Sequence, residues 1–391
     1  MTWRHSTFKT ITILLPLAFA VAIAMDIYIP SVPELVNVFN SSPATIQLTL
    51  SLFLIFFGIG QLILGPLSDQ FGRRRVALLS TVAYIASSFL CATAHTVTAL
   101  IIFRIFEAIS ACGMAVSANA IIRDVYSERD SGRMYSYLNG AIAMSPLFAP
   151  LIGGYLDIYF GWRSSFLTLA VFGVIAVFII LTQIHETHEK HKRLRMNKTV
   201  FTRYLEIFKH RDFRFFVFSG ASGMSCLFTF FSISPYLLIN DLGVPRQHFG
   251  FYFAVMGLLF FIGSIVAGKL VMKIGLRNNV LIGAICCFGG ALFMMGWYFS
   301  EGLSLASFIV PMIPISLGAA FLIGAGAGGA MEPFGEMAGT AAAMFGTTQF
   351  LFASLVGTTV MLFPAKSTIP LAGAAGVLGL IVLLWWIKRT Q

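Results

Sequence analysis

The 391-residue chain is 58% apolar and only 11% charged, with a mean hydropathy of +0.86. Soluble domains carry about 25% charged residues, so this composition excludes a soluble globular protein and indicates a chain whose solvent is lipid. The formal net charge of +10 would suit a nucleic-acid partner in a soluble protein. Here the basic residues stand in short segments between apolar runs, which favours membrane topology instead.

Apolar runs of about 20 residues, the length that crosses a bilayer as a helix, recur from one end of the chain to the other. They predict twelve membrane-spanning helices, near residues 11–33, 44–66, 76–95, 97–118, 134–157, 164–184, 213–238, 249–272, 279–299, 304–328, 338–363 and 368–387. The alternating segments that indicate a membrane β-barrel are not found in the sequence. The first run continues to Ile29, so we expect a first membrane helix rather than a cleavable signal peptide.

The distribution of Lys and Arg predicts the orientation of these helices. If the N-terminus lies in the cytoplasm, 22 of the 26 basic residues fall in cytoplasmic segments. Arg163, Arg246 and Lys366 fall in outer loops, and Arg104 falls inside a span. Because cytoplasmic segments are enriched in Lys and Arg, we expect both termini in the cytoplasm.

One long polar stretch, residues 185–212, divides the twelve predicted helices into six and six. We interpret it as a cytoplasmic linker that contains a short amphipathic helix near 199–210. It separates a six-helix bundle of residues 1–184 from a second of residues 213–391. Histidines in a basic linker are usually only solvated, and the five cysteines lie in apolar spans, so we predict neither a metal site nor disulfides.

The two halves share a pattern after their second predicted helix. GPLSDQFGRRRV (65–76) and GKLVMKIGLRNNV (268–280) both have Gly, Leu two residues later, and a second Gly seven residues after the first, followed by Arg. Internal duplication of six-helix bundles is typical of many transporters.

An acidic residue interrupts the end of the first apolar run, in AMDIYIPSVP (24–33). A carboxylate inside a bilayer is costly unless it faces water, a partner or a proton. A carboxyl group whose proton affinity changes with its surroundings can load and release a proton. Asp26 is therefore either a group that couples transport to a proton or to a cationic substrate, or a hydrated or structurally paired residue near the outer mouth. Pro30 and Pro33 predict that the helix kinks or ends there.

Two more charged residues lie inside the fourth predicted helix. Arg104 and Glu107 are three residues apart, so they share one helix face. They form either a structural ion pair or a charge relay with Asp26. Arginine stays protonated in proteins, so in such a relay the carboxyl groups carry the proton and Arg104 shifts between them.

The turn after the second helix combines glycines with charges. Gly65 and Gly72 allow a tight turn and close packing, while Asp69 and the arginines from Arg73 to Arg75 place charge at a helix end. The simpler interpretation is topology alone, with three arginines holding the loop on the cytoplasmic side.

These residues together resemble the major facilitator superfamily. GPLSDQFGRRR is similar to the signature of that superfamily between helices two and three, and AMDIYIPSVPEL resembles the helix-one pattern of its twelve-helix drug:proton antiporters. RIFEAISACG (104–113) resembles their helix-four pattern, with Arg104 on the arginine, and SPLFAPLIGG (145–154) resembles their helix-five pattern. The nearest group is the Bcr/CflA drug-resistance transporters, which include bicyclomycin and phenicol exporters. Glu107 and Ala108 depart from it, because the pattern usually has Gln and Gly there.

The resemblance implies an all-α membrane protein of twelve helices in two pseudo-repeat bundles, the major facilitator fold. It implies proton coupling by Asp26, Arg104 and Glu107, and a conformational latch formed by Gly65, Asp69, Gly72, Arg73 and Arg74. It also implies a helix-five hinge or seal formed by Pro146, Pro150, Gly153 and Gly154, where the simpler interpretation is a kinked packing helix. We expect a monomer in the bacterial inner (cytoplasmic) membrane, driven by the proton gradient without a cofactor, with a small-molecule substrate, protons and lipid as partners and no nucleic acid.

The candidates for substrate contact are polar or aromatic residues that would line a central apolar cavity: Tyr28, Asn139, Phe228, Phe231, Tyr236 and Gln349. The sequence predicts a proton-coupled exporter of small, largely apolar compounds. A dedicated exporter of an endogenous metabolite or siderophore is the alternative, and a membrane sensor without transport is a third. The GAGAGG run (324–329) lacks the Lys-Ser/Thr of a nucleotide loop, and no nucleophile–base pair predicts an enzyme.

Overall fold

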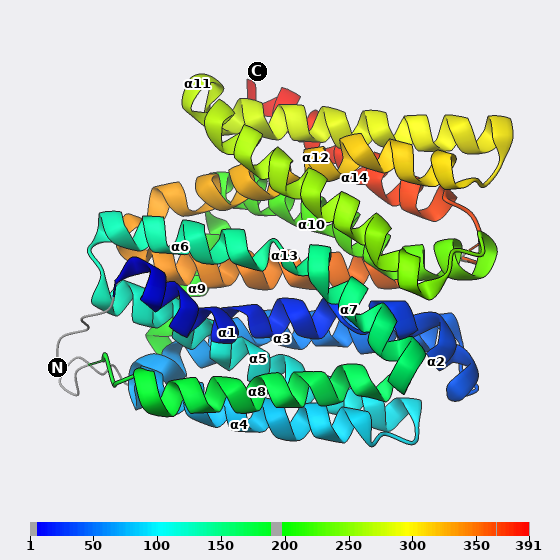
Figure 1. Ribbon diagram of the computed structural model, residues 1–391. Helices are drawn as coiled ribbons and strands as arrows, with labels where there is room; N and C mark the ends of the chain where they lie inside the picture. The colour runs from blue at the N-terminus through cyan, green and yellow to red at the C-terminus, as the bar shows by residue number, and fades with distance from the viewer. Residues whose placement is uncertain (1–5, 189–197, 365, 391) are drawn as a thin grey trace.

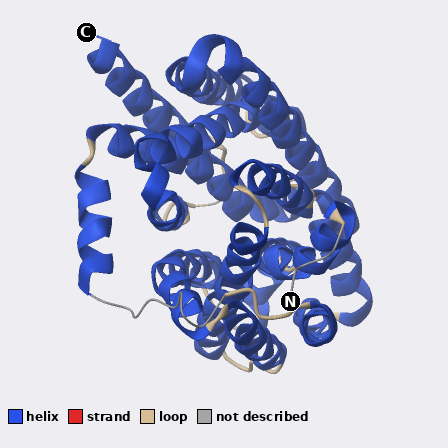
Figure 2. Cartoon of the chain, turned by 90° about the vertical axis from the view of Figure 1, so that its left-hand side faces the viewer, coloured by secondary structure: helices blue, strands red, loops and turns tan. Residues whose placement is uncertain are grey.

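The computed structural model describes residues 6–188, 198–364 and 366–390, and in these ranges the chain forms helices and connecting turns without a strand (Figure 2). The helices, in chain order, are α1 (Thr7–Asp26), η1 (Ile29–Ser31), α2 (Val32–Val38), α3 (Pro43–Phe71), α4 (Arg73–Ala92), α5 (Val97–Val125), α6 (Glu128–Ile142), α7 (Ser145–Phe160), α8 (Arg163–Gln183), α9 (Lys198–Lys209), α10 (Arg211–Pro235), η3 (Tyr236–Asp241), α11 (Arg246–Glu301), α12 (Leu305–Met331), η4 (Glu332–Met337), α13 (Ala338–Val360) and α14 (Ile369–Thr390). The prediction of an all-helical protein is confirmed.

Eleven helices in the described ranges are long and apolar enough to cross a membrane. One of them, α11, has 56 residues and covers two predicted spans. Its path breaks at Gly275, whose φ of 80° and ψ of 167° suit glycine and strain other residues. Figure 1 shows the two limbs of α11 on either side of this break. The twelve predicted crossings are therefore present, with two of them joined through one glycine.

The first crossing ends as the prolines predict. α1 stops at Asp26, and after a short turn the chain continues as the 3₁₀ helix η1 and then as α2. Pro30 and Pro33 stand in the first turns of η1 and α2, where a missing backbone N–H breaks no helix hydrogen bond. Asp26 thus lies at a helix end inside the protein.

The helices run side by side along one long direction, with α4 and α8 at one edge and α11 and α14 at the opposite edge (Figure 1). Two long helix pairs join the parts of the chain on either side of residues 185–212: α3 packs along α13, and α7 packs along α11. The Thr347 hydroxyl donates to the Gly58 carbonyl at 2.7 Å in the first of these seams. The division into bundles 1–184 and 213–391 stays a prediction.

The predicted amphipathic helix in the linker is confirmed as α9. Ile207 and Tyr204 on α9 are buried, and the Tyr204 hydroxyl donates to the Leu62 carbonyl on α3 at 3.3 Å. The rest of the segment from 189 to 197 lies outside the described residues. Where it is described, this linker is therefore packed onto the helices.

Candidate functional site

The two charged residues of α5 form a fully buried ion pair. Arg104 Nη1 lies 2.7 Å from Glu107 Oε2, and both side chains have no solvent-exposed surface. The hydroxyl of Ser88, on α4, donates to the other carboxylate oxygen of Glu107 at 2.7 Å. The spacing of three residues places both side chains on one helix face, and the ion pair is one of the two interpretations that the sequence left open. A buried ion pair is costly to desolvate. Further contacts to its two side chains are therefore required to offset that cost.

Carbonyl groups and aromatic rings supply those contacts to Arg104. The guanidinium donates to the Ala24 carbonyl of α1 at 3.0 Å and to the Thr49 carbonyl of α3 at 3.4 Å. Its central carbon lies 4.1 Å from the ring centre of Phe53 and 4.8 Å from that of Tyr28. Cations are attracted to such ring faces. Arg104 therefore ties α5 to α1 and α3 in the interior of the protein.

Asp26 lies nearby but is not paired with Arg104. Its side chain is only 4% exposed, at the end of α1 and beside Ser145 of α7. Within the part of the chain that the structure describes, no basic side chain comes within ion-pair distance of Asp26. The guanidinium of Arg104 instead contacts the α1 backbone two residues earlier, at Ala24. The structure thus pairs Arg104 with Glu107 and leaves Asp26 outside that pair. Their coupling role stays a prediction.

The candidates for substrate contact occupy different surroundings. Tyr28 is buried and its hydroxyl bonds to that of Thr49. Phe228 and Tyr236 are buried on α10 and η3, and the Tyr236 hydroxyl has no hydrogen-bond partner in the described structure. The remaining three are Phe231, whose ring stacks on Phe253 at 4.9 Å, Gln349, which is buried on α13, and Asn139, which is exposed on α6.

A polar face of α3 that the sequence analysis did not single out also reaches the second half. Gln47 donates to the Ser232 hydroxyl of α10 at 2.6 Å. The Ser51 carbonyl accepts from Ser354 of α13 at 2.8 Å. The four-residue spacing of Gln47 and Ser51 in an apolar run puts them on one helix face. That spacing was the available signal, because small and polar residues gather where membrane helices contact each other.

The turn after α3 contains several ion pairs. Arg73 is 1% exposed, and its guanidinium lies 2.5 Å from Asp69 and 2.8 Å from Asp124, at the end of α5. Its backbone N–H donates to Glu186 at 2.9 Å, and His188 lies 3.7 Å from Asp124. These partners all belong to residues 1–188. The turn therefore fastens α3, α4, α5 and the start of the linker to one another.

The glycines of this turn differ in what they contribute. Gly72 adopts φ 100° and ψ 151°, so it supplies the tight turn that the sequence predicts. Gly65 does not: a side chain there would meet nothing within 4 Å, so the predicted close packing at Gly65 is wrong. Arg74 donates to the Leu181 carbonyl at 3.1 Å. Whether the turn latches the two halves stays a prediction, although Arg123, which pairs with Asp69 at 3.4 Å, also reaches Gly339 at the start of α13.

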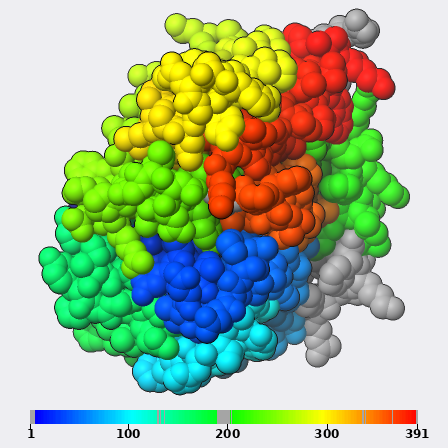
Figure 3. Space-filling view, turned by 90° about the vertical axis from the view of Figure 1, so that its right-hand side faces the viewer, coloured from blue at the N-terminus to red at the C-terminus, as the bar shows by residue number. Residues whose placement is uncertain are grey.

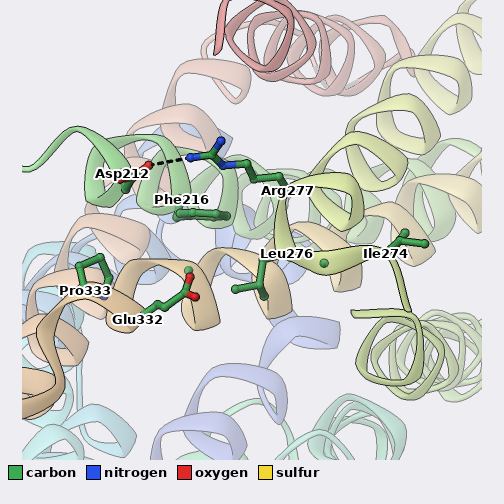
Figure 4. Close-up of a pocket in the computed structure, with 9 residues that line it drawn as sticks. Asp212, Phe216, Ile274, Leu276, Arg277, Glu332 and Pro333 are labelled. Carbon is green, nitrogen blue, oxygen red and sulfur yellow. Dashed lines mark hydrogen bonds and ion pairs between the residues drawn. The ribbon is translucent and has the colours of Figure 1, made fainter. Parts of the chain in front are cut away.

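The corresponding turn of the second half repeats the backbone but not the ion pairs. Gly275 has nearly the dihedral angles of Gly72, which confirms the echo between the two motifs. Arg277 is 56% exposed and pairs at 3.3 Å with Asp212 of α10, while Glu332 lies apart from that pair (Figure 4). Between them is a cavity of about 450 Å³, lined by Asp212, Phe216, Ile274, Gly275, Leu276, Arg277, Gly329, Glu332 and Pro333.

The helix-five stretch forms α7 and packs tightly at its glycines. Pro146 stands in its first turn and Pro150 inside it. A side chain at Gly153 would overlap the carbonyl of Ile27, the residue after α1, and one at Gly154 would come 2.8 Å from the Arg246 carbonyl of α11. These glycines let three backbones meet. The packing suits a seal as well as a hinge, and the role stays a prediction.

The sequence of this chain matches a known protein family and several known proteins. The profile of the Major Facilitator Superfamily matches residues 14–358. The chain is 31% identical over 333 residues to a chloramphenicol resistance protein of Pseudomonas aeruginosa, covering 85% of this chain and 78% of that protein. It is 25% identical to a bicyclomycin resistance protein homolog of Haemophilus influenzae, covering 83% and 80%. It is 27% identical to multidrug resistance protein D of Escherichia coli, covering 97% and 96%.

Solved structures share the arrangement of helices. The xylose transporter XylE from E. coli, in a partially occluded inward-open conformation, superposes with a TM-score of 0.75 over 98% of this chain and 97% of that one. The sequence identity is 16%, so the likeness concerns the fold alone. The predicted major facilitator fold is confirmed.

Proposed function

The chain belongs to the Major Facilitator Superfamily, and from this premise we propose that it exports small, largely apolar drugs in exchange for protons. It is a membrane transporter related to drug-resistance efflux proteins, and not an enzyme. The proton coupling, the direction of transport and the class of drug belong to the proposal.

The observation that carries the proposal is the unequal pairing of two buried acids with one arginine. Glu107 holds Arg104 at 2.7 Å, whereas Asp26 has no cation although the same guanidinium bonds Ala24 on its helix. A buried carboxyl group without a cation is favoured in its protonated form. Asp26 is therefore the group that carries the proton in this arrangement.

In the proposed cycle, Arg104 moves between the two acids while remaining charged. When Asp26 loses its proton to the cytoplasm, its carboxylate attracts the guanidinium that already lies against its helix. Glu107 then keeps its hydrogen bond from Ser88 and loses part of its pairing with Arg104. When a proton returns to Asp26 from the outer side, Arg104 goes back to Glu107. Arg104 also donates to the Thr49 carbonyl of α3. In the proposed cycle, its movement between the two acids therefore acts on α3 as well, and this couples helix movement to proton movement.

The bundles 1–184 and 213–391 rock about the midplane in this proposal, with residues 185–212 as their linker. Cross-half contacts near the ends of α3 and α10, such as the bond from Gln47 to Ser232, support a state that is closed on the outer side. We place both termini in the cytoplasm and the protein, as a monomer, in the bacterial inner membrane. The distribution of basic residues supports this orientation.

The substrate class follows from the second half and from the relatives. The buried residues of α10 include many with aromatic rings or hydroxyl groups, and none of its described buried residues is charged. Such surroundings suit neutral molecules with a few hydrogen-bonding groups. The relatives are named for chloramphenicol and bicyclomycin resistance, so a phenicol-like or bicyclomycin-like drug is the proposed cargo.

The test measures proton release from energised inverted vesicles. Chloramphenicol, florfenicol or bicyclomycin is added while internal pH is followed, in wild type, in Asp26→Asn and in the control Glu301→Gln. Glu301 is exposed and accepts from Trp297. We expect drug-induced alkalinisation in wild type and control, and none in Asp26→Asn. A wild-type response in Asp26→Asn would contradict the coupling role, and no response to any compound in wild type would favour the metabolite exporter.

A further inference from the structure

A three-membered charge cluster joins the two halves at the end of the protein opposite the linker. Arg246, the first residue of α11, lies 2.9 Å from Asp157 of α7 through its Nη1 atom. The same nitrogen also pairs with Glu34 of α2. The segments that carry these residues meet on the face shown in Figure 3, where the blue α2 region and the yellow-green start of α11 lie close together. We call Glu34, Asp157 and Arg246 the outer clasp.

The outer clasp is unlike the other ion pairs in the described ranges. Those on α5 and on the turn after α3 join residues within 1–188, and the pair of Asp212 with Arg277 joins the last residue of the linker to the second half. Among ion pairs between described residues, only those of Arg246 connect residues 1–184 with residues 213–391. In the described ranges, the Arg246 side chain therefore forms every ion pair between residues 1–184 and residues 213–391.

The three side chains of the outer clasp differ in their exposure to solvent. The Asp157 side chain has no exposed surface, whereas Arg246 and Glu34 are 34% and 33% exposed. A fully buried carboxylate is costly to leave without its cation, while an exposed pair contributes little. The clasp therefore favours the closed outer end strongly while Asp157 is buried, and weakly once water reaches it.

The backbones of α7 and α11 pack closely beneath the clasp. The Gly154 Cα lies so near Arg246 that a Cβ would come 2.8 Å from the Arg246 carbonyl. A side chain at Gly250, one turn along α11, would come 2.7 Å from Leu151 of α7. To separate α7 from α11 here, the chain must withdraw Arg246 from Asp157.

We propose that Arg246 is a positioning residue of the transport cycle, which holds the outer ends of the two halves closed and must leave Asp157 before the outer side opens. This inference goes beyond the proposed drug and proton exchange, because it requires neither a particular substrate nor the coupling role of Asp26. A side chain that stabilises one of two states shifts their populations by its differential contribution. Loss of Arg246 should therefore increase the outward-open fraction.

The experiment reports opening through a cysteine at Ser354. This residue is fully buried, and its hydroxyl donates across the seam between α13 and α3 to the Ser51 carbonyl at 2.8 Å. A maleimide that does not cross membranes is added to intact cells and, in parallel, to inverted vesicles. The chain without the added cysteine gives the background, since its five cysteines are buried or partly buried.

Four forms are compared in the Ser354→Cys chain: Arg246 unchanged, Arg246→Ala, Arg246→Lys and Arg163→Ala. Arg163 is the matched control, because it is an outer-loop arginine whose described contacts, with the Ala94 carbonyl and the Trp162 ring, lie within the first half. We expect Arg246→Ala to raise the labelling rate in cells by roughly tenfold. Arg246→Lys should restore most of the slow rate, and Arg163→Ala should leave it unchanged.

Equal labelling rates for Arg246 and Arg246→Ala would overturn the proposal. So would equal acceleration by Arg163→Ala, because the effect would then come from general loosening. If Arg246→Ala does not accumulate in the membrane, Glu34→Gln replaces it, with a smaller acceleration expected because Glu34 is partly exposed. No acceleration in Glu34→Gln would then count against the clasp. Labelling needs no substrate, so its outcome stands apart from the drug experiment.

Discussion

The first and second halves of the chain have similar helices but differ in what they bury. The buried charged side chains in the described ranges are Asp26, Arg73, Arg104, Glu107 and Asp157, and all belong to residues 1–184. The described residues of 213–391 bury hydroxyls and amides instead, including Thr229, Asn279 and Gln349. One half therefore carries ionisable groups in its interior and the other carries neutral polar groups.

This difference shows how the two halves of a duplicated fold can take on different tasks. A buried charge is costly, so it persists where it is paired or where it carries protons. A neutral hydroxyl is cheaper to bury and can serve substrates of varied shape. In the proposed function, the first half responds to protons and the second half adapts to the cargo. Each prediction below tests one part of that contrast.

The largest effect should follow removal of a buried charge from the first half. Glu107→Ala leaves Arg104 without its carboxylate in a site with no exposed surface. We expect a loss of about 3–5 kcal/mol in the free energy of unfolding. The matched change in the second half is Asn279→Ala, which removes a 2.8 Å bond to the Ala267 carbonyl and should cost about 1 kcal/mol. Unfolding in mixed micelles with increasing SDS measures both.

Replacing both members of the pair supplies the control for this comparison. In the double variant Arg104→Met, Glu107→Met no uncompensated charge remains, so we expect it to be more stable than Glu107→Ala. It should nevertheless fail to couple transport to protons. Equal costs for Glu107→Ala and Asn279→Ala would show that the two halves do not differ energetically.

An intermediate effect should separate the two glycine turns. Arg73→Ala removes a buried guanidinium from Asp69 and Asp124, and we expect a loss of about 2 kcal/mol. Arg277→Ala removes an exposed pair with Asp212, and we expect less than about 1 kcal/mol. The same SDS titration compares them. A larger loss for Arg277→Ala would mean that the second turn is the stronger one.

The smallest effect concerns a buried hydroxyl of α10 that lacks a partner. Thr229 is fully buried, and its hydroxyl has no hydrogen bond in the described structure. Thr229→Val keeps the shape and removes this group, so stability should rise by about 1 kcal/mol. If the hydroxyl serves the cargo, the apparent affinity for drug should fall at the same time. Ser225→Ala is the control, because Ser225 already donates to its own helix at Ala221. Unchanged drug affinity in Thr229→Val would exclude that contact.

The helices and the central charges could be predicted from the sequence for physical reasons. Runs of about 20 apolar residues have one stable form in lipid, and Asp26, Arg104 and Glu107 stand out because ionisable residues are rare there. The spacing of Arg104 and Glu107 also placed them on one helix face, where an ion pair was one of two interpretations. Contacts between helices that are distant in sequence, such as Arg104 with the Thr49 carbonyl, depend on packing and could not be predicted from spacing.

The contacts of the outer clasp could not be predicted from the sequence either. Glu34, Asp157 and Arg246 stand near helix ends, where charged residues are ordinary and draw no attention in a sequence. Their meeting depends on how α2, α7 and α11 converge. Gly65 shows the reverse case. Its identity as glycine predicted close packing, yet a side chain there would meet nothing within 4 Å, and of the two glycines only Gly72 adopts a backbone that needs glycine.

Gly275 gives α11 a mechanical property. The two limbs of this helix are joined by one residue with no slack chain between them, so they form a hairpin lever whose fulcrum is Gly275. The limb from there to Arg246 has 29 residues and a length of roughly 44 Å. A tilt of about 10° at the fulcrum would carry its far end through about 8 Å. In the proposed transport cycle, a small rotation at Gly275 would thereby become a displacement long enough to separate Arg246 from Asp157.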